Sequence, residues 1–405
     1  MDLGNGYGHL TYSTLVHPDD TWAEMRASLE TYLPEVKRRF SPDAPMGVSL
    51  RISNSSAETL INDPAERAWV KTFLDDNDLY VYTVNAFPFG PFKGEIVKER
   101  VYEPDWSTEE RTRYTMNVAR ILTEITGPDV EPTIQSAPLA FRPKVTDDAY
   151  VAAFTDNLLR VAAFLMDLER ETGRRVKLAL EPEPYCFLET IEETVEYFTA
   201  HVYTLDAAIR VGHLSGQPLS EVFGGLRRHL GVVFDICHQS VEFEDITNDL
   251  HLLMQAGIPI FKLQEAAALM VSEVTPEIIG ELKKYTGTIY LSQTTERRNG
   301  ELTRYLNLED AIAAWEADPG PREWRTHFHV PVFLADLGPF QTTRAGIDAA
   351  LAVHAATPLS NHLEIETYTW DVLPEHLKTG EITEYVVREL EYVRDELARQ
   401  VEAAG

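Results

Sequence analysis

Short apolar segments alternate with longer amphipathic segments along most of the chain. Several short segments, such as GVVF at 231–234, are apolar on both faces, which is typical of strands buried in a parallel sheet. Strand and helix in regular alternation predict parallel strands joined by right-handed crossovers. The expected strands are residues 8–12, 47–52, 79–84, 133–136, 176–180, 231–234, 259–263, 325–333 and 362–365.

The segments between these strands carry helix signals. Apolar residues recur at close to 3.6 positions between residues 22 and 40. Asp63 followed by Pro64 and Glu66 predicts a helix start, and STEE at 107–110 predicts a capping box for a helix ending near residue 126. Further helices are expected at about 146–172, 190–212, 221–229, 245–256, 345–355 and 383–401.

A closed (β/α)8 barrel fits this repeat best, and roughly 250 residues suffice for one. An open doubly wound sheet is the alternative, but the chain has no G-x-G-x-x-G or G-x-x-x-x-G-K-[ST] phosphate loop. Nine strands are one too many, and residues 288–300 resemble a hairpin. We therefore expect a single domain over residues 1–405, with an insertion at about 265–322 at the catalytic end of the barrel. For the seventh strand we prefer 327–331 over 261–264.

Charge and cysteine content narrow the classes of partner. The 405 residues carry a formal net charge of −29, which repels phosphate backbones and anionic lipid, so neither nucleic acid nor a membrane surface is expected as a partner. The N-terminus lacks the basic and apolar regions of a signal peptide, and no apolar run is expected to span a bilayer. Cys186 and Cys237 cannot build a disulfide framework. They predict a reduced pair lining a pocket in a cytoplasmic protein.

Candidate ligands for a metal ion stand where predicted strands end. Glu181, Asp235, His329 and Glu366 occupy such positions, although nearly 190 residues separate the first from the last. The C-terminal ends of parallel barrel strands meet at one rim, where the catalytic groups of such barrels lie. Carboxylates together with an imidazole suit a divalent ion such as Mn²⁺, Mg²⁺, Co²⁺ or Zn²⁺.

Each candidate has a structural alternative. Asp235 is placed to cap the helix that follows it. Glu183 or Glu189 is the alternative to Glu181, which we prefer because Glu183 lies beyond Pro182 and outside the strand. His327 and His329 share one face of a strand, as do Glu364 and Glu366, and in each pair we prefer the residue nearer the C-terminal end.

Other polar side chains are expected to line the pocket. His238 is a candidate for binding a substrate hydroxyl, with a hydrogen bond to the Asp235 backbone as its alternative. The remaining candidates for substrate contacts are His327, Gln264, Asn85 and Gln293. Gln264 competes with His329 as the ligand from the seventh strand.

Taken together, the LEPEP segment, D-x-x-H, H-x-H and a late E-x-E-T resemble the xylose-isomerase-like barrels, the sugar phosphate isomerase/epimerase superfamily. Longer blocks resemble the EboE-type metabolite traffic proteins nearly end to end; they are residues 9–18, 84–94, 101–115, 234–245, 326–333 and 363–374. The first block departs from that group, which has Cys and Asn where this chain has Ser13 and Leu15. This departure weakens the case for a substrate contact from the first strand and leaves the implied metal site unaffected.

The resemblance implies that Glu181 and Glu366 bind the metal and act as the acid/base pair. Asp235 and His329 would complete the metal site, and His238 would hold a substrate hydroxyl. The implied activity is metal-dependent isomerisation or epimerisation of a sugar or cyclitol-like polyhydroxy carbonyl metabolite through an enediolate. The alternatives are a dehydratase or hydrolase on the same barrel, or a non-catalytic metabolite binder. Docking of the insertion against a partner or a second copy, giving a homo-oligomer, is left open.

Overall fold

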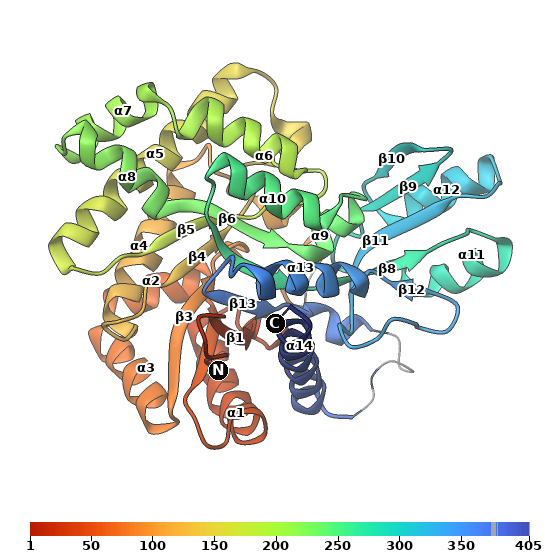
Figure 1. The fold of residues 1–405 in the computed structure, drawn as a ribbon, viewed down its shortest axis with the longest axis horizontal. Helices are drawn as coiled ribbons and strands as arrows, with labels where there is room; N and C mark the ends of the chain where they lie inside the picture. Colours follow the sequence, from red (N-terminus) through yellow and green to blue (C-terminus); the bar gives the residue numbers. More distant parts are fainter. Residues whose placement is uncertain (95, 374–377, 379, 405) are drawn as a thin grey trace.

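Eight parallel strands form a nearly closed barrel in the computed structural model, which describes residues 1–94, 96–373, 378 and 380–404 (Figure 1). Around the barrel the strands follow the order β1-β13-β7-β6-β5-β4-β3-β2. β1 and β2 meet through an isolated bridge between Ser13 and Ser49. The strand bounds are β1 His9–Tyr12, β2 Met46–Arg51, β3 Leu79–Asn85, β4 Thr133–Ser136, β5 Lys177–Leu180, β6 Leu230–Asp235, β7 Ile260–Glu265 and β13 His362–Ile365. The predicted (β/α)8 barrel is confirmed.

Most of the helices surround the barrel (Figure 1). Their starts follow the sequence signals: Asp63 caps α3, with Pro64 in its first turn, and Thr108 rather than Ser107 caps α4. α2 was not predicted, because its sequence gives little apolar periodicity. The helix bounds are α1 Trp22–Phe40, α2 Asn54–Asn62, α3 Pro64–Asp76, α4 Glu109–Ile125, α5 Asp148–Thr172, α6 Ile191–Tyr197, α7 Leu205–Ser215, α8 Leu219–His229, α9 Ile236–Val241, α10 Ile246–Ala256, α11 Pro276–Leu282, α12 Leu308–Ala317, α13 Arg344–Ala356 and α14 Ile382–Ala404.

A second sheet of five strands lies to one side of the barrel (Figure 1). Its order is β10-β9-β11-β8-β12, and its paired strands are antiparallel. One residue, Ala266, separates barrel strand β7 from β8, so the chain passes directly from one sheet into the other. The strand bounds are β8 Ala267–Val271, β9 Thr294–Arg298, β10 Glu301–Tyr305, β11 Glu323–Val330 and β12 Gln341–Thr342.

This second sheet corrects one sequence prediction. The preference for residues 327–331 as the seventh barrel strand is wrong: they belong mostly to β11, whereas β7 pairs with β6 and β13 in the barrel. A hairpin is present as β9 and β10, with Asn299 and Gly300 at its tip, but its first strand is residues 294–298 and not the expected 288–293. The second sheet runs from β8 to β12, beyond the expected insertion at 265–322, because β11 and β12 pair with β8.

One helix, α5, is long and apolar enough by length and composition to cross a membrane, contrary to the sequence expectation. In this structure α5 is an outer helix of the barrel. Its apolar side chains, including Phe154, Leu158, Val161 and Leu165, are buried in the protein core. Burial in the core therefore accounts for part of its apolar composition, since 44% of its apolar window is buried.

The barrel interior contains polar groups below the rim that carries the site. Lys262 on β7 donates to Glu364 on β13 at 2.9 Å and to Gln135 on β4 at 2.5 Å, and all three side chains are fully buried. Deeper still, the hydroxyl of Thr133 lies 2.8 Å from Nδ1 of His362. Buried polar groups of this kind are stable only when paired. This pairing holds in place the strands whose C-terminal ends carry the site.

Candidate metal and substrate site

Three carboxylates converge at the C-terminal rim of the barrel. Glu181 follows β5, Asp235 ends β6 and Glu366 follows β13, and one ligand oxygen from each lies within 4.8 Å of the others. At most 5 % of each of these residues is exposed to solvent. Residues far apart in the sequence are therefore brought to one point by the parallel strands.

Amide side chains hold two of these carboxylates in place. Gln264 Nε2 donates to Glu366 Oε2 at 2.6 Å and to Glu181 Oε1 at 3.1 Å, so it bridges the two acids. Gln135 donates to Glu181 at 2.6 Å, and Asn85 donates to Glu366 at 2.7 Å. Neutral donors orient the carboxylates without neutralising their charge.

Asp235 caps the helix that follows it and also faces the site. Its Oδ1 accepts the backbone N–H of His238 at 2.9 Å, as an N-cap does, while Oδ2 is buried without a hydrogen-bond partner. The His238 side chain places Nδ1 2.9 Å from the carbonyl oxygen of Pro182, which can only accept. Nδ1 therefore carries the proton, and Nε2 keeps a lone pair 3.7 Å from Asp235 Oδ2.

Crowding and burial perturb the acid–base properties of these groups. Burial, followed by the charges of Glu366 and Asp235, raises the pKa of Glu181 well above its usual range. Burial, with Glu364 and Asp235 nearby, does the same to the pKa of Glu366. Burial lowers the pKa of His238 to about 3 and that of His329 to about 4. In this arrangement the carboxylates favour a shared proton or a cation, and the imidazoles favour the neutral, ligand-competent form.

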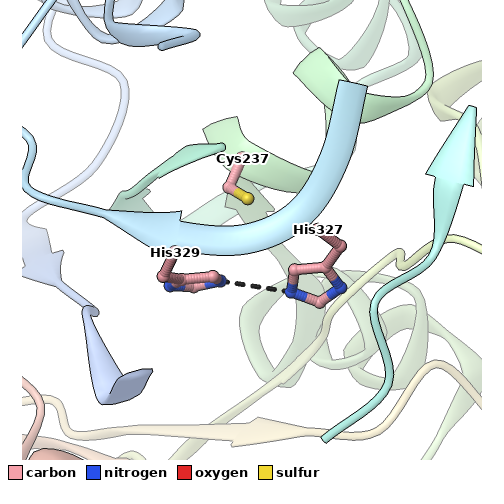
Figure 2. Close-up of side chains that lie close together, drawn as sticks. All are labelled: Cys237, His327 and His329. Carbon is pink, nitrogen blue, oxygen red and sulfur yellow. Dashed lines mark hydrogen bonds between the residues drawn. The ribbon is translucent and has the colours of Figure 1, made fainter. Parts of the chain in front are cut away.

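Two further histidines come from β11 of the second sheet. His327 and His329 lie with their Nε2 atoms 3.1 Å apart, and Cys237 of α9 lies beside them (Figure 2). His329 forms a separate ligand group with Asp235 and His238, again within 4.8 Å. The β11–β8 ladder shifts register between Thr326 and His329, and such bulges re-aim side chains near functional sites.

A partly enclosed pocket lies beside Glu181 and Glu366. Its polar lining residues are Asn85, Lys98, Tyr102, Glu181, Glu183, His238, Gln293, His327 and Glu366. Its remaining wall is mainly apolar and aromatic, from Leu15, Phe87, Pro88, Phe92, Tyr290, Leu291 and Tyr368. The cavity therefore joins a polar floor to an apolar wall.

The structure brings most of the predicted site residues together. Asn85, His238 and His327 line the cavity, and Gln264 joins the two glutamates directly. Both cysteines are free and buried, but neither is among the residues lining the cavity. Glu364, the alternative to Glu366, lies one layer deeper against Lys262. Pro374, the last residue of the block at 363–374, lies outside the described residues.

Several site residues were missed or ranked low from the sequence. Glu183, set aside because it follows Pro182, is buried and lines the cavity, where it accepts from the Tyr102 hydroxyl at 2.7 Å. Burial raises its pKa to about 8. Gln135 lies near the C-terminal end of β4, and the other candidates were chosen because they lie at the ends of their strands. The same criterion would have identified Gln135. Tyr102 lies in a loop and has no comparable signal.

A scan of protein-family models finds no match, and no curated protein matches the sequence. Solved structures do match in fold. A D-tagatose 3-epimerase-like protein is 13% identical, covering 98% of this chain and 100% of its own, with a TM-score of 0.51. A sugar phosphate isomerase/epimerase homologue of Anabaena variabilis is 11% identical, covering 97% and 99%, also with a TM-score of 0.51.

A xylose isomerase-like TIM barrel protein of Mycobacterium smegmatis, in complex with magnesium, is 8% identical. The match covers 97% of this chain and 98% of that protein, with a TM-score of 0.51. Identities this low establish the architecture and leave the chemistry to be argued from the residues of this chain. The chain has the xylose-isomerase-like TIM barrel fold.

Proposed function

We propose that this protein is a divalent-metal-dependent isomerase or epimerase of a small polyhydroxylated carbonyl compound. The observation that carries the proposal is the convergence of Glu181, Asp235 and Glu366 at the barrel rim, beside a pocket that Glu181 and Glu366 line. The resemblance to EboE-type metabolite traffic proteins supports a small metabolite, such as a sugar or cyclitol-like ring, as the substrate.

The residues at this point fit a hard divalent cation. The three buried carboxylates accept hydrogen bonds from side-chain amides and from the backbone N–H of His238, and Asp235 Oδ2 is buried without a hydrogen-bond partner. Gln264 Oε1 is also buried without a partner. Exchange of the Gln264 amide N and O would present an oxygen between the two glutamates, and oxygen ligands suit Mg²⁺ or Mn²⁺.

His329 is the fourth metal ligand predicted from the sequence. In this proposal it is not a ligand of the carboxylate site. Its Nδ1 lies 2.5 Å from the carbonyl oxygen of Glu366, so Nδ1 donates and Nε2 points toward His327. We therefore assign Gln264 the fourth position of the carboxylate site. His329 supports that site through its hydrogen bond to the Glu366 backbone.

The two glutamates are placed for proton transfer. A divalent ion held here would polarise the carbonyl and neighbouring hydroxyl oxygens of a substrate, which acidifies the C–H bond between them. One of Glu181 and Glu366 takes that proton, and the C–H electron pair moves to the carbonyl oxygen to give an enediolate. The other glutamate, in its protonated form, returns a proton to the opposite face of the same carbon, which gives the epimer. For isomerisation it protonates the former carbonyl carbon, while the proton of the neighbouring hydroxyl passes to the former carbonyl oxygen. The lone pair of His238 Nε2 accepts a hydrogen bond from a substrate hydroxyl.

The proposal is tested by deuterium exchange. Protein loaded with Mn²⁺ is incubated in D₂O with a panel of ketoses and inososes, and incorporation beside the carbonyl is followed by NMR. We expect exchange with at least one compound and a fall of about 10²–10⁴-fold in Glu366→Gln, the usual contribution of a positioned acid or base. Glu189→Gln is the matched control, since Glu189 is buried but does not line the cavity.

Absence of exchange from every compound, with wild type equal to Glu366→Gln, overturns the isomerase proposal. In that outcome a retained metal ion would favour a metabolite binder that grips its ligand without proton transfer. Loss of water or of a phosphoryl group from a substrate, seen in the same spectra, would instead identify a dehydratase or hydrolase.

A further inference from the structure

Two lone-pair nitrogens face each other beside the carboxylate site. His329 Nδ1 donates to the carbonyl oxygen of Glu366, so its Nε2 is an acceptor. His327 Nε2 lies 3.1 Å from it (Figure 2). Whether that contact is a hydrogen bond depends on which nitrogen of His327 carries the proton.

The surroundings of Gln293 settle the tautomer of His327. The Gln293 amide nitrogen donates to the carbonyl oxygen of Pro184 at 3.4 Å, which can only accept, and it also lies 3.3 Å from Glu183 Oε1. The amide oxygen therefore points to His327 Nδ1, 3.0 Å away, which must donate. His327 Nε2 is then also an acceptor, and two acceptors meet with no hydrogen atom between them.

The buried contact between these two lone pairs is repulsive, and the Tyr368 hydroxyl lies 3.5 Å from His327 Nε2, too far to relieve that repulsion fully. A positive charge between the two rings would stabilise the contact. His327 is 5 % exposed and His329 is fully buried, and a separation of 3.1 Å leaves no room for a water molecule between the two nitrogens. Two nitrogens on one tetrahedral zinc ion are about 3.3 Å apart, from metal–nitrogen distances of 2.0–2.1 Å. The observed 3.1 Å separation is close to that value.

A third ligand is at hand from a different element. Cys237 on α9 places its sulfur within 4.8 Å of nitrogens of both His327 and His329 (Figure 2). Cys237 is fully buried and otherwise packs against Val241, Ala266 and Ala268. Two imidazoles and one sulfur are ligands for zinc and similar borderline ions, in contrast to the oxygen ligands of the carboxylate site.

We propose that His327, His329 and Cys237 form a second metal site, selective for a borderline ion such as Zn²⁺ or Co²⁺. The ion ties β11 of the second sheet to α9 of the barrel. Three protein ligands leave one position of a tetrahedral ion for water or a substrate oxygen, as in catalytic zinc sites. His327 also lines the cavity, so the second site adjoins the substrate space.

Cobalt provides the test, because a thiolate bound to Co²⁺ gives a charge-transfer band in the near ultraviolet. Full-length protein is stripped with a chelator and titrated with Co²⁺. We expect the band in wild type, in Cys186→Ser and in Glu366→Gln, and its loss in Cys237→Ser. Cys186 is the matched control, because it is the chain's other buried free cysteine and lies in a separate apolar cluster. Retention in Glu366→Gln separates this site from the proposed isomerase centre.

Absence of the band from wild type, or its persistence in Cys237→Ser, overturns the proposal. The first result would mean that a proton, rather than a metal ion, lies between the two histidines. If Cys237→Ser does not fold, X-ray absorption of zinc-loaded wild type decides the matter. One sulfur at about 2.3 Å and nitrogens at about 2.0–2.1 Å support the site, and a shell of nitrogen and oxygen alone refutes it.

Discussion

Removal of the Lys262 side chain tests how the barrel interior supports the site. Lys262 is fully buried, and its Nζ lies 2.9 Å from Glu364 Oε2 and 2.5 Å from Gln135 Oε1. Glu364 Oε1 has no hydrogen-bond partner. Lys262→Met therefore leaves Glu364 as a buried carboxylate without a counter-charge, and it frees Gln135 from the orientation in which Gln135 donates to Glu181.

The expected loss is about 3–5 kcal/mol of the free energy of unfolding, the usual cost of removing one partner from a buried ion pair. Lys262→Met/Glu364→Gln removes the stranded charge and should recover most of that loss. Lys284→Met is the matched control: its ion pair with Glu281 is exposed, so its removal should cost at most about 1 kcal/mol.

Urea unfolding of the metal-free protein, followed by circular dichroism, measures these differences. The double variant distinguishes the cost of the buried charge from the loss of orientation. Its free energy of unfolding should return toward that of wild type, whereas Glu181 should stay misoriented and the affinity for Mn²⁺ should stay reduced. A Lys262→Met protein within 1 kcal/mol of wild type, or a double variant no more stable than the single one, would refute the reasoning.

Three further predictions concern single residues. Burial raises the pKa of Glu389 to about 8, so the folded protein keeps a proton that the unfolded chain releases above about pH 4.5. The free energy of unfolding should therefore fall between those pH values, and Glu389→Gln should flatten this slope in urea titrations. Arg111 is fully buried and donates to three backbone carbonyls around the loop after β3. Arg111→Met should accelerate proteolysis at residues 86–104, whereas exposed Arg113→Met should not; equal cleavage would contradict this role. A Cβ at Gly231 would lie 2.5 Å from a backbone oxygen, so Gly231→Ala should lower stability by about 1–3 kcal/mol. Gly280→Ala, in open space within α11, should raise it by up to about 1 kcal/mol in thermal unfolding.

The sequence predicted the barrel and its three carboxylates because both follow from local order. Strand and helix alternate, and parallel strands place their C-terminal residues at one rim. Glu181, Asp235 and Glu366 needed only that rule. Gln135 satisfied it too, but an amide near a strand end gives no signal of its own until its partner is known.

Pairing between distant segments was not accessible in the same way. β8 follows β7 after one residue, so nothing marks the point where the chain leaves the barrel. β11 was taken for a barrel strand because a strand's apolar pattern does not reveal which sheet it joins. The partnership of Lys262 with Glu364, 102 residues apart, likewise depends on β7 and β13 being neighbours.

The origin of the histidines has a consequence for how the site could change. The acidic residues belong to the rigid barrel, whereas His327 and His329 arrive on a strand of the neighbouring antiparallel sheet. A shift of that sheet by about an ångström would alter the distances from His327 and His329 to the carboxylates and leave the carboxylates in register with one another. Substitutions where the two sheets pack together would therefore change the positions of His327 and His329 without moving the carboxylates.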